Sequence, residues 1–162
     1  MRKVLIIVCS VFLFASMAAA QGKVDNQWKC SKPSVEHSIP VGDQPGHAYM
    51  IEQIKCSAAK GEIAGVKEKE GTGTEFHDVM GDKDSLHGIF VETMTNGDKI
   101  TYSYEGTVTL KAGKFVSGSN KWMSTSGGGK FKGIKASGTC SAKGNPDGSS
   151  VFDCTGTYSG VK

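Results

Sequence analysis

The chain has 162 residues, of which 38% are hydrophobic and 22% charged, with a formal net charge of +3 at neutral pH. This balance, without a cluster of Lys and Arg among aromatic residues, argues against nucleic-acid binding. All 22 glycines follow residue 20, where they make up roughly 15% of the residues, about twice the usual share. With many Thr, Ser and Val, this composition favours strands and tight turns over helices.

Residues 1–20 have the pattern of a secretory signal peptide. A basic start at Arg2 and Lys3 precedes an apolar run, and the small residues 18–20 stand before a cleavage point at Gln21. The apolar run is short for a transmembrane helix. We therefore expect export to the periplasm or the extracellular space without stable membrane insertion, and a single domain over residues 21–162. The segment carries two of the 19 basic residues and none of the 16 acidic ones, so that domain has a net charge of about +1.

The first part of this domain gives weak signals. Residues 21–46 contain three prolines without sustained periodicity and predict an extended segment with one edge strand near residues 27–32. Residues 47–58 alternate well enough for a strand. The charged residues 60–73 fit either a strand or a loop, and residues 74–80 fit a further strand.

The strongest hairpin signal is Asn96-Gly97, which is typical of a two-residue type I′ turn. Such a turn places Ile89 opposite Tyr104 and divides the hairpin into two faces. The first face, which we expect to lie on the core, holds Ile89, Val91, Thr93, Ile100, Tyr102 and Tyr104. The second, which we expect to be largely solvated, holds Phe90, Glu92, Met94, Lys99, Thr101, Ser103 and Glu105.

Further strands follow in short succession. Ala112-Gly113 predicts a second hairpin within residues 107–117, and residues 120–124 continue the β pattern. The glycine-rich residues 127–134 predict a tight coil with a single helical turn near Lys130 before the next strand.

Four cysteines outside the signal segment predict two disulfides in an oxidising compartment. The turn signal Asn145–Gly148 predicts a last hairpin between residues 136–143 and 149–158. If this hairpin is centred on Asp147, Cys140 lies directly opposite Cys154, and the remaining pair is Cys30–Cys56. A four-cysteine zinc site is disfavoured because neither pair has the short spacing of such sites.

Eight or nine strands in consecutive hairpins predict an all-β fold. Our first choice is a small antiparallel up-and-down β-barrel of about eight strands, because closure removes exposed strand edges. The alternative is a two-sheet sandwich.

Residues 86–158 resemble a known group of barrels. The runs Tyr104–Val108, Gly113–Phe115 and Gly127–Thr139 (GGGKFKGIKASGT) are similar to the signature GGTGKFxGxxGxGT of allene-oxide-cyclase-like and dirigent-like proteins, among them bacterial secreted relatives of unassigned function. Ala136 stands where a glycine is common. The resemblance implies an eight-stranded barrel with an apolar cavity, often oligomeric. It implies no reaction, because no catalytic residue of the plant enzymes matches a position here.

Two groups of polar residues suggest chemistry. His77 and His87 could approach each other across a hairpin with Asp78, Asp82 or Asp84 nearby, as a Zn²⁺ or Cu²⁺ site requires. The favoured interpretation is a polar turn at residues 81–85, with no metal and no cofactor. Glu92 and Glu105 share a predicted face and could act as an acid–base pair, although a solvated strand surface explains them equally simply.

We expect an exported barrel that binds a small apolar or amphipathic ligand in its lumen, with no assigned catalytic residue. The candidate contacts are Phe90, Glu92, Tyr102, Tyr104 and Trp122. One alternative is a cyclase- or isomerase-type enzyme acting by cavity shape, and another is a structural or interaction protein with a filled barrel. The sequence leaves open whether the domain forms a homo-oligomer.

Overall fold

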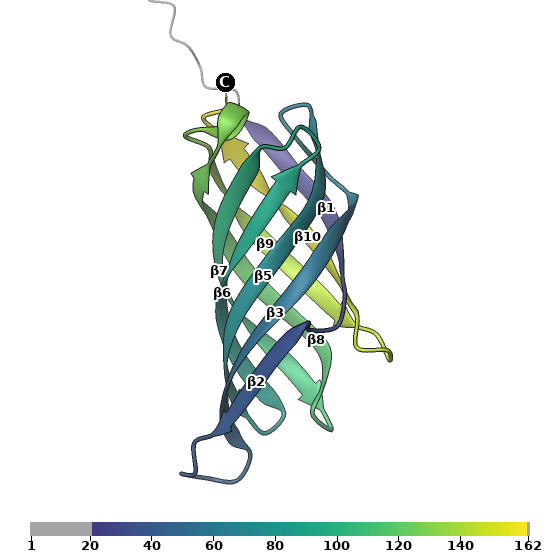
Figure 1. The fold of residues 1–162 in the computed structure, drawn as a ribbon, viewed down its shortest axis with the longest axis vertical. Coiled ribbons are helices and arrows are strands. Elements are labelled where there is room, and N and C mark those ends of the chain that lie inside the picture. The colour runs from purple at the N-terminus through teal and green to yellow at the C-terminus, as the bar shows by residue number, and fades with distance from the viewer. Residues whose placement is uncertain (1–20, 162) are drawn as a thin grey trace, which may run out of the picture.

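A closed antiparallel barrel forms the body of the protein in a computed structural model that describes residues 21–161 (Figure 1). Each barrel strand pairs with the next along the chain, and the last pairs with the first. The eight barrel strands are β1 (Gly22–Cys30), β3 (His47–Lys60), β5 (Val66–Met80), β6 (Lys83–Met94), β7 (Lys99–Lys111), β8 (Lys114–Gly127), β9 (Lys135–Gly144) and β10 (Ser150–Ser159). The expected all-β up-and-down barrel is therefore confirmed, while the expected signal peptide lies outside the described residues.

Three short elements complete the fold. Strand β2 (Val35–Pro40) pairs with the same edge of β3 as β1 does, and it projects from one end of the barrel (Figure 1). Strand β4 (Glu62–Ile63) pairs with β5. The 3₁₀ helix η1 (Gly129–Phe131), the turn expected near Lys130, lies at the opposite end from β2. Within the described part of the chain, no helix is long and apolar enough to cross a membrane.

Two predictions for the first half of the domain need correction. The edge strand expected near residues 27–32 is instead β1, a wall strand paired with both β10 and β3. It can lie inside the sheet because its alternate residues Val24 and Trp28 bury their side chains. Residues 66–80, expected as parts of two separate segments, form the single long strand β5, whose pairing with β6 shifts register between Glu68 and Glu70.

The hairpin between β6 and β7 has a register that differs by one residue from the prediction. Only Gly97 of the Asn96-Gly97 pair has a positive φ, 86°, whereas a type I′ turn needs two such residues. The amide of Met94 instead donates to the carbonyl of Asp98 at 2.8 Å. This is the three-residue loop that ends in a left-handed glycine. A shift of one residue exchanges the faces of one strand, so Phe90 lies opposite Tyr102.

Two cross-strand disulfides lie within the wall, Cys30–Cys56 and Cys140–Cys154, and both predicted pairings are confirmed. In the last hairpin Cys140 pairs directly with Cys154. The Cα atoms of each bridged pair are 4.0 Å apart, so neighbouring strands are covalently joined at two places. Ala112 and Gly113, both with positive φ, form the expected second hairpin turn between β7 and β8.

The side chain of Trp122 lies across the inner wall because two neighbouring positions are glycines. A Cβ atom at Gly138 would lie 2.5 Å from the Trp122 ring, and one at Gly156 would lie 2.7 Å from it. Both distances are shorter than real Cβ contacts allow. The glycines of β9 and β10 therefore make room for an aromatic side chain that lines the lumen.

Candidate functional site

The lumen is closed at one end by apolar side chains. Phe131 of η1 is fully buried there, and it packs in one cluster with Ile63, Met94 and Ile100, each of which is at most 1% exposed. These side chains come from η1, β4, β6 and β7 respectively. The helix and the neighbouring strand ends thus close this end of the barrel with a packed apolar cluster.

The rest of the lumen holds two neighbouring spaces. An inner cavity of about 80 Å³ is enclosed by aromatic and aliphatic side chains and by the two disulfides. A wider lower chamber of about 580 Å³ extends toward the end that carries β2. The two spaces share five lining residues, namely Ile54, Glu75, Tyr104, Asn120 and Phe152. The two spaces are therefore direct neighbours within the barrel.

All five predicted contact residues, Phe90, Glu92, Tyr102, Tyr104 and Trp122, line the inner cavity. The observed register brings Phe90 and Glu92 onto the same wall as the two tyrosines, although we expected them on opposite faces of the hairpin. The same register points Glu105 outward, opposite His87. The acid–base pair of Glu92 and Glu105, considered as one possibility, is therefore excluded, because only Glu92 faces the lumen.

A buried carboxyl group lies at the wall of the inner cavity. Glu92 is 1% exposed and accepts a hydrogen bond of 2.8 Å from the hydroxyl of Tyr102. Burial, with a contribution from the nearby Glu68 carboxylate, raises the pKa of Glu92 to about 8. Burial also raises the pKa of Glu68 to about 7, although the Asn26 amide donates to its carboxylate at 2.8 Å. At neutral pH Glu92 is thus mainly protonated.

Four polar atoms of residues that line the inner cavity have no hydrogen-bond partner among the described residues: Oδ1 of Asn26, Oε1 of Glu92, Oδ1 of Asn120 and the indole Nε1 of Trp122. Buried polar groups are normally paired, because leaving one unpaired costs about 1–3 kcal/mol. These atoms can accept or donate hydrogen bonds to a molecule that occupies the cavity.

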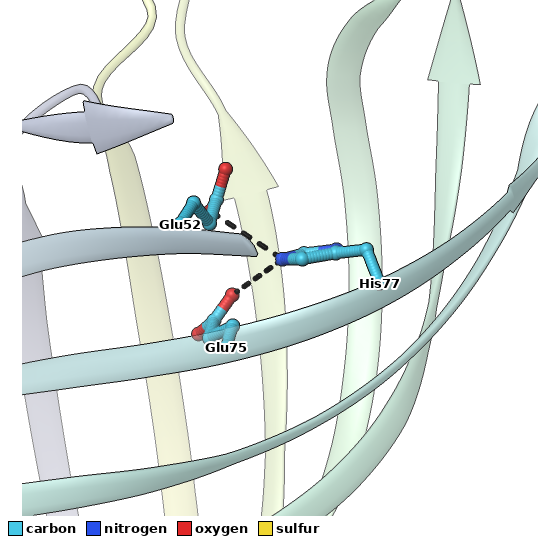
Figure 2. A group of neighbouring side chains, drawn as sticks. All are labelled: Glu52, Glu75 and His77. Carbon is cyan, nitrogen blue, oxygen red and sulfur yellow. Dashed lines mark ion pairs between the residues drawn. The ribbon is translucent and has the colours of Figure 1, made fainter. Parts of the chain in front are cut away.

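A second polar cluster lies in the wall of the lower chamber, around His77 (Figure 2). Its Nδ1 is 2.7 Å from Oδ2 of Asp84. Its Nε2 is 3.3 Å from Oε2 of Glu75 and 3.7 Å from Oε1 of Glu52. The hydroxyl of Tyr104 donates to Oε1 of Glu75 at 2.5 Å. One imidazole is thus surrounded by three carboxyl groups.

Burial and the neighbouring charges shift the pKa values of the groups in this cluster. Burial tends to lower the pKa of His77, but the hydrogen bond to Asp84 and the neighbouring carboxylates outweigh burial and raise it to about 10. Burial and repulsion from Glu75 raise the pKa of Glu52 to about 7. Burial and the carboxylate of Glu75 likewise raise the pKa of Tyr104 above its usual value. The cluster therefore holds extra protons at neutral pH.

His77 and His87 do not approach each other, so the metal site considered as the less favoured interpretation is not formed by this pair. In the pairing of β5 with β6, His77 lies opposite Leu86 and His87 lies opposite Phe76. Since side chains alternate along a strand, His77 points into the barrel and His87 points outward, where it stacks on Phe76 with ring centroids 5.5 Å apart. Asp84, assigned to a polar turn, is a buried residue of β6.

Sequence reasoning missed the inward positions of Glu52 and Glu75, although one signal was present. Cys56 is buried in its bridge to Cys30, and Glu52 and Ile54 share its parity on β3. The pairing of Glu52 with Glu75 then places both carboxylates in the lumen. This second step needs the register of β3 against β5, which no turn signal gives.

Comparisons with known proteins bear on the fold. No family model and no curated protein matches the chain. Among solved structures, one pterocarpan synthase dirigent protein has a TM-score of 0.52 at 8% identity, with 99% of this chain and 100% of that chain covered. Another has a TM-score of 0.49 at 10% identity, with coverages of 88% and 97%.

The first of these neighbours supports the dirigent-like part of the resemblance seen in the sequence. The comparisons support neither an allene-oxide-cyclase-like assignment nor a bacterial origin. At such low identity the similarity concerns the fold alone, since one fold hosts many functions. The chain has the barrel fold of a dirigent protein.

Proposed function

We propose that the lumen binds a small, largely apolar molecule that carries a hydroxyl or similar neutral polar group. The observation that carries this proposal is the pair of neighbouring spaces within the barrel, which its own side chains leave unfilled. The lower chamber falls within the range of about 300–1,000 Å³ that is usual for ligand pockets, whereas the inner cavity of about 80 Å³ would hold only one end of such a molecule. A barrel that served only as a scaffold would fill its interior with side chains, so this space weighs against the filled-barrel alternative.

The walls support an apolar body for this ligand. Trp28 and Phe90 meet edge to face with ring centroids 5.1 Å apart, and Tyr102 and Trp122 do so at 5.5 Å. Such rigid aromatic surfaces contribute contact area at little cost in side-chain entropy. Burial of an ionised group beside them would be costly, which favours a neutral ligand. The unpartnered atoms of Glu92, Asn120 and Trp122 would meet its polar group.

Intrinsic fluorescence gives a direct test, because Trp28 and Trp122 are the only two tryptophans of the chain and both line the inner cavity. We expect 4-propylphenol to change this fluorescence saturably and to bind more tightly than propylbenzene, which lacks the hydroxyl. One neutral hydrogen bond corresponds to a difference of about 3- to 10-fold. In an Asn120→Leu variant this difference should shrink, whereas the outward-facing Lys121→Leu control should retain it.

Two results would contradict the proposal. The first is an unchanged fluorescence up to the solubility limit of both compounds. The second is a bare polypeptide mass in native mass spectrometry of the protein purified from its own source and exposed to lipid and phenolic extracts. Together they would favour a barrel that acts through its outer surface and loops.

A second candidate function is acid catalysis of a cyclase or isomerase type within the same lumen. The protonated Glu92 beside the cavity favours it, since a carboxylic acid kept neutral near pH 7 can donate a proton. If this candidate is right, Glu92→Gln will still bind the ligand but will not convert it. Equal turnover by the variant and the natural protein would exclude the role.

We also propose that the protein functions in the periplasm or outside the cell. The two disulfides support an oxidising compartment, and residues 1–20 have the composition of a signal peptide. Cell fractionation with mass spectrometry of the N-terminus would test this. A chain that retains residue 1 and free thiols in the cytoplasm would contradict it.

A further inference from the structure

Three side chains in the lower chamber converge on one point. Glu52 of β3 lies directly opposite Glu75 of β5, and His77 follows Glu75 on the same face of β5. One ligand-type atom from each of these residues lies within 4.8 Å of the others (Figure 2). Paired strands rather than a loop hold all three side chains, so their arrangement is set by the register of the barrel wall.

The spacing of these atoms suits a metal ion. Nε2 of His77 is 3.3 Å from Oε2 of Glu75 and 3.7 Å from Oε1 of Glu52. Two ligands of a tetrahedral Zn²⁺ with bonds of about 2.0–2.1 Å are about 3.3 Å apart. Small side-chain rotations are therefore enough for the three atoms to share one ion.

The imidazole provides independent evidence for a missing partner. The His77 side chain is 5% exposed, and its Nδ1–H donates to Asp84 at 2.7 Å. Its Nε2 is buried and, although it faces two carboxylates, it makes a hydrogen bond with neither. A buried nitrogen that lies near two carboxylates without a well-formed hydrogen bond to either leaves room for a cation that all three groups could bind.

The surroundings also resemble those of metal ligands. A ligating histidine usually donates its other N–H to a carboxylate, which orients the ring, and ligating carboxylates are usually hydrogen-bonded in turn. Asp84 fills the first role for His77, and the hydroxyl of Tyr104 fills the second for Glu75. Two of the three ligands are therefore held in place by partners that do not face the ion.

We propose that Glu52, Glu75 and His77 bind one divalent transition-metal ion, and that Asp84 and Tyr104 are positioning residues for this site. Zn²⁺ fits the ligand set, since it accepts both carboxylate oxygen and imidazole nitrogen. Three protein ligands leave at least one coordination position directed into the lower chamber, where water or another small oxygen ligand completes the sphere. The inference stands apart from the proposed binding of a hydroxylated molecule in the inner cavity.

Isothermal titration of the metal-free purified protein with ZnCl₂ tests this site. We expect one ion per chain. Glu52→Gln, which keeps the shape of the side chain, and His77→Ala should each weaken binding by about 100-fold or more. Asp84→Asn should weaken it by about 10- to 100-fold, as the loss of an outer-shell partner does. His87→Ala is the matched control on the outer face and should bind as the natural protein does.

Co²⁺ provides a second readout, because the visible absorption of the bound ion reports its coordination directly. We expect a spectrum of bound Co²⁺ with the natural protein and with His87→Ala, and its loss with Glu52→Gln. If His77→Ala fails to fold by circular dichroism, Glu52→Gln decides the question.

The proposal is overturned if the natural protein binds no Zn²⁺ up to millimolar concentration, or if Glu52→Gln binds as tightly as the natural protein. It is also overturned if His87→Ala alone abolishes binding, which would place the ion on the outer surface. In these cases the cluster is an ion network in which a protonated His77 neutralises its carboxylate neighbours.

Discussion

Replacement of Glu92 by Gln should reduce the pH dependence of stability. The folded protein holds the Glu92 proton with a pKa of about 8, against 4.5 for an ordinary glutamate. Because the folded state binds this proton more tightly than the unfolded state does, the free energy of unfolding falls as the pH rises from about 4.5 to about 8. Gln resembles the protonated carboxyl and does not titrate, so this part of the slope disappears in the variant.

The magnitude follows from the two pKa values. Between pH 5 and pH 7 the unfolded state releases the proton while the folded state retains it. This difference corresponds to about 2 kcal/mol lost from the free energy of unfolding. The raised pKa of Glu68 acts in the same direction, and it remains in the variant. We therefore expect the Glu92→Gln protein to lose about 2 kcal/mol less than the natural protein over this range.

Urea unfolding at pH 5 and pH 7, followed by tryptophan fluorescence, measures this quantity. The control is Glu62→Gln, which removes an exposed carboxyl of β4 and should leave the natural slope unchanged. A natural protein that becomes more stable from pH 5 to pH 7, or a Glu92→Gln variant with the full natural slope, would refute the reasoning.

Three further predictions concern stability in urea. Replacement of Cys30 and Cys56 by Ala should lower the free energy of unfolding by about 3.5 kcal/mol, and replacement of Cys140 and Cys154 by about 3 kcal/mol. The first loss is larger because loop-closure entropy grows with the separation of the bridged residues, which is 26 for the first pair and 14 for the second. The reverse order would contradict this account. Phe131→Ala should lower the free energy of unfolding by about 3–5 kcal/mol, because it leaves a cavity in the apolar cluster that closes one end of the barrel. A loss below about 1 kcal/mol would show that this end is loosely packed. Gly97→Ala should cost about 1–2 kcal/mol through its left-handed backbone alone, since its φ is 86° and a Cβ would meet no atom within 4 Å; an unchanged midpoint would refute this.

The residues of the inner wall could be predicted wherever a turn signal in the sequence defined both a strand and which of its alternating side chains point inward. Asn145–Gly148 defines one turn, and the turn fixes the opposition of Cys140 and Cys154, as observed. Four of the five candidate contacts, Phe90, Glu92, Tyr102 and Tyr104, come from the alternating pattern of the β6–β7 hairpin, and Trp122 comes from β8. Their grouping onto faces was wrong, because Asn96-Gly97 is compatible with both a two-residue and a three-residue loop.

The sequence by itself determined the strands of the second half of the domain, most of the turns and, through the turn at Asn145–Gly148, both disulfides, because these depend mainly on residues close in the chain. Only the tertiary structure decided how the wall closes, with β1 between β10 and β3. It also decided that Glu52, Glu75, His77 and Asp84 meet in the lumen. Their meeting depends on the mutual register of β3, β5 and β6, and a shift of one residue would turn a strand's buried charges outward. That register is selected by the packing of the whole barrel, so no segment read alone contains it.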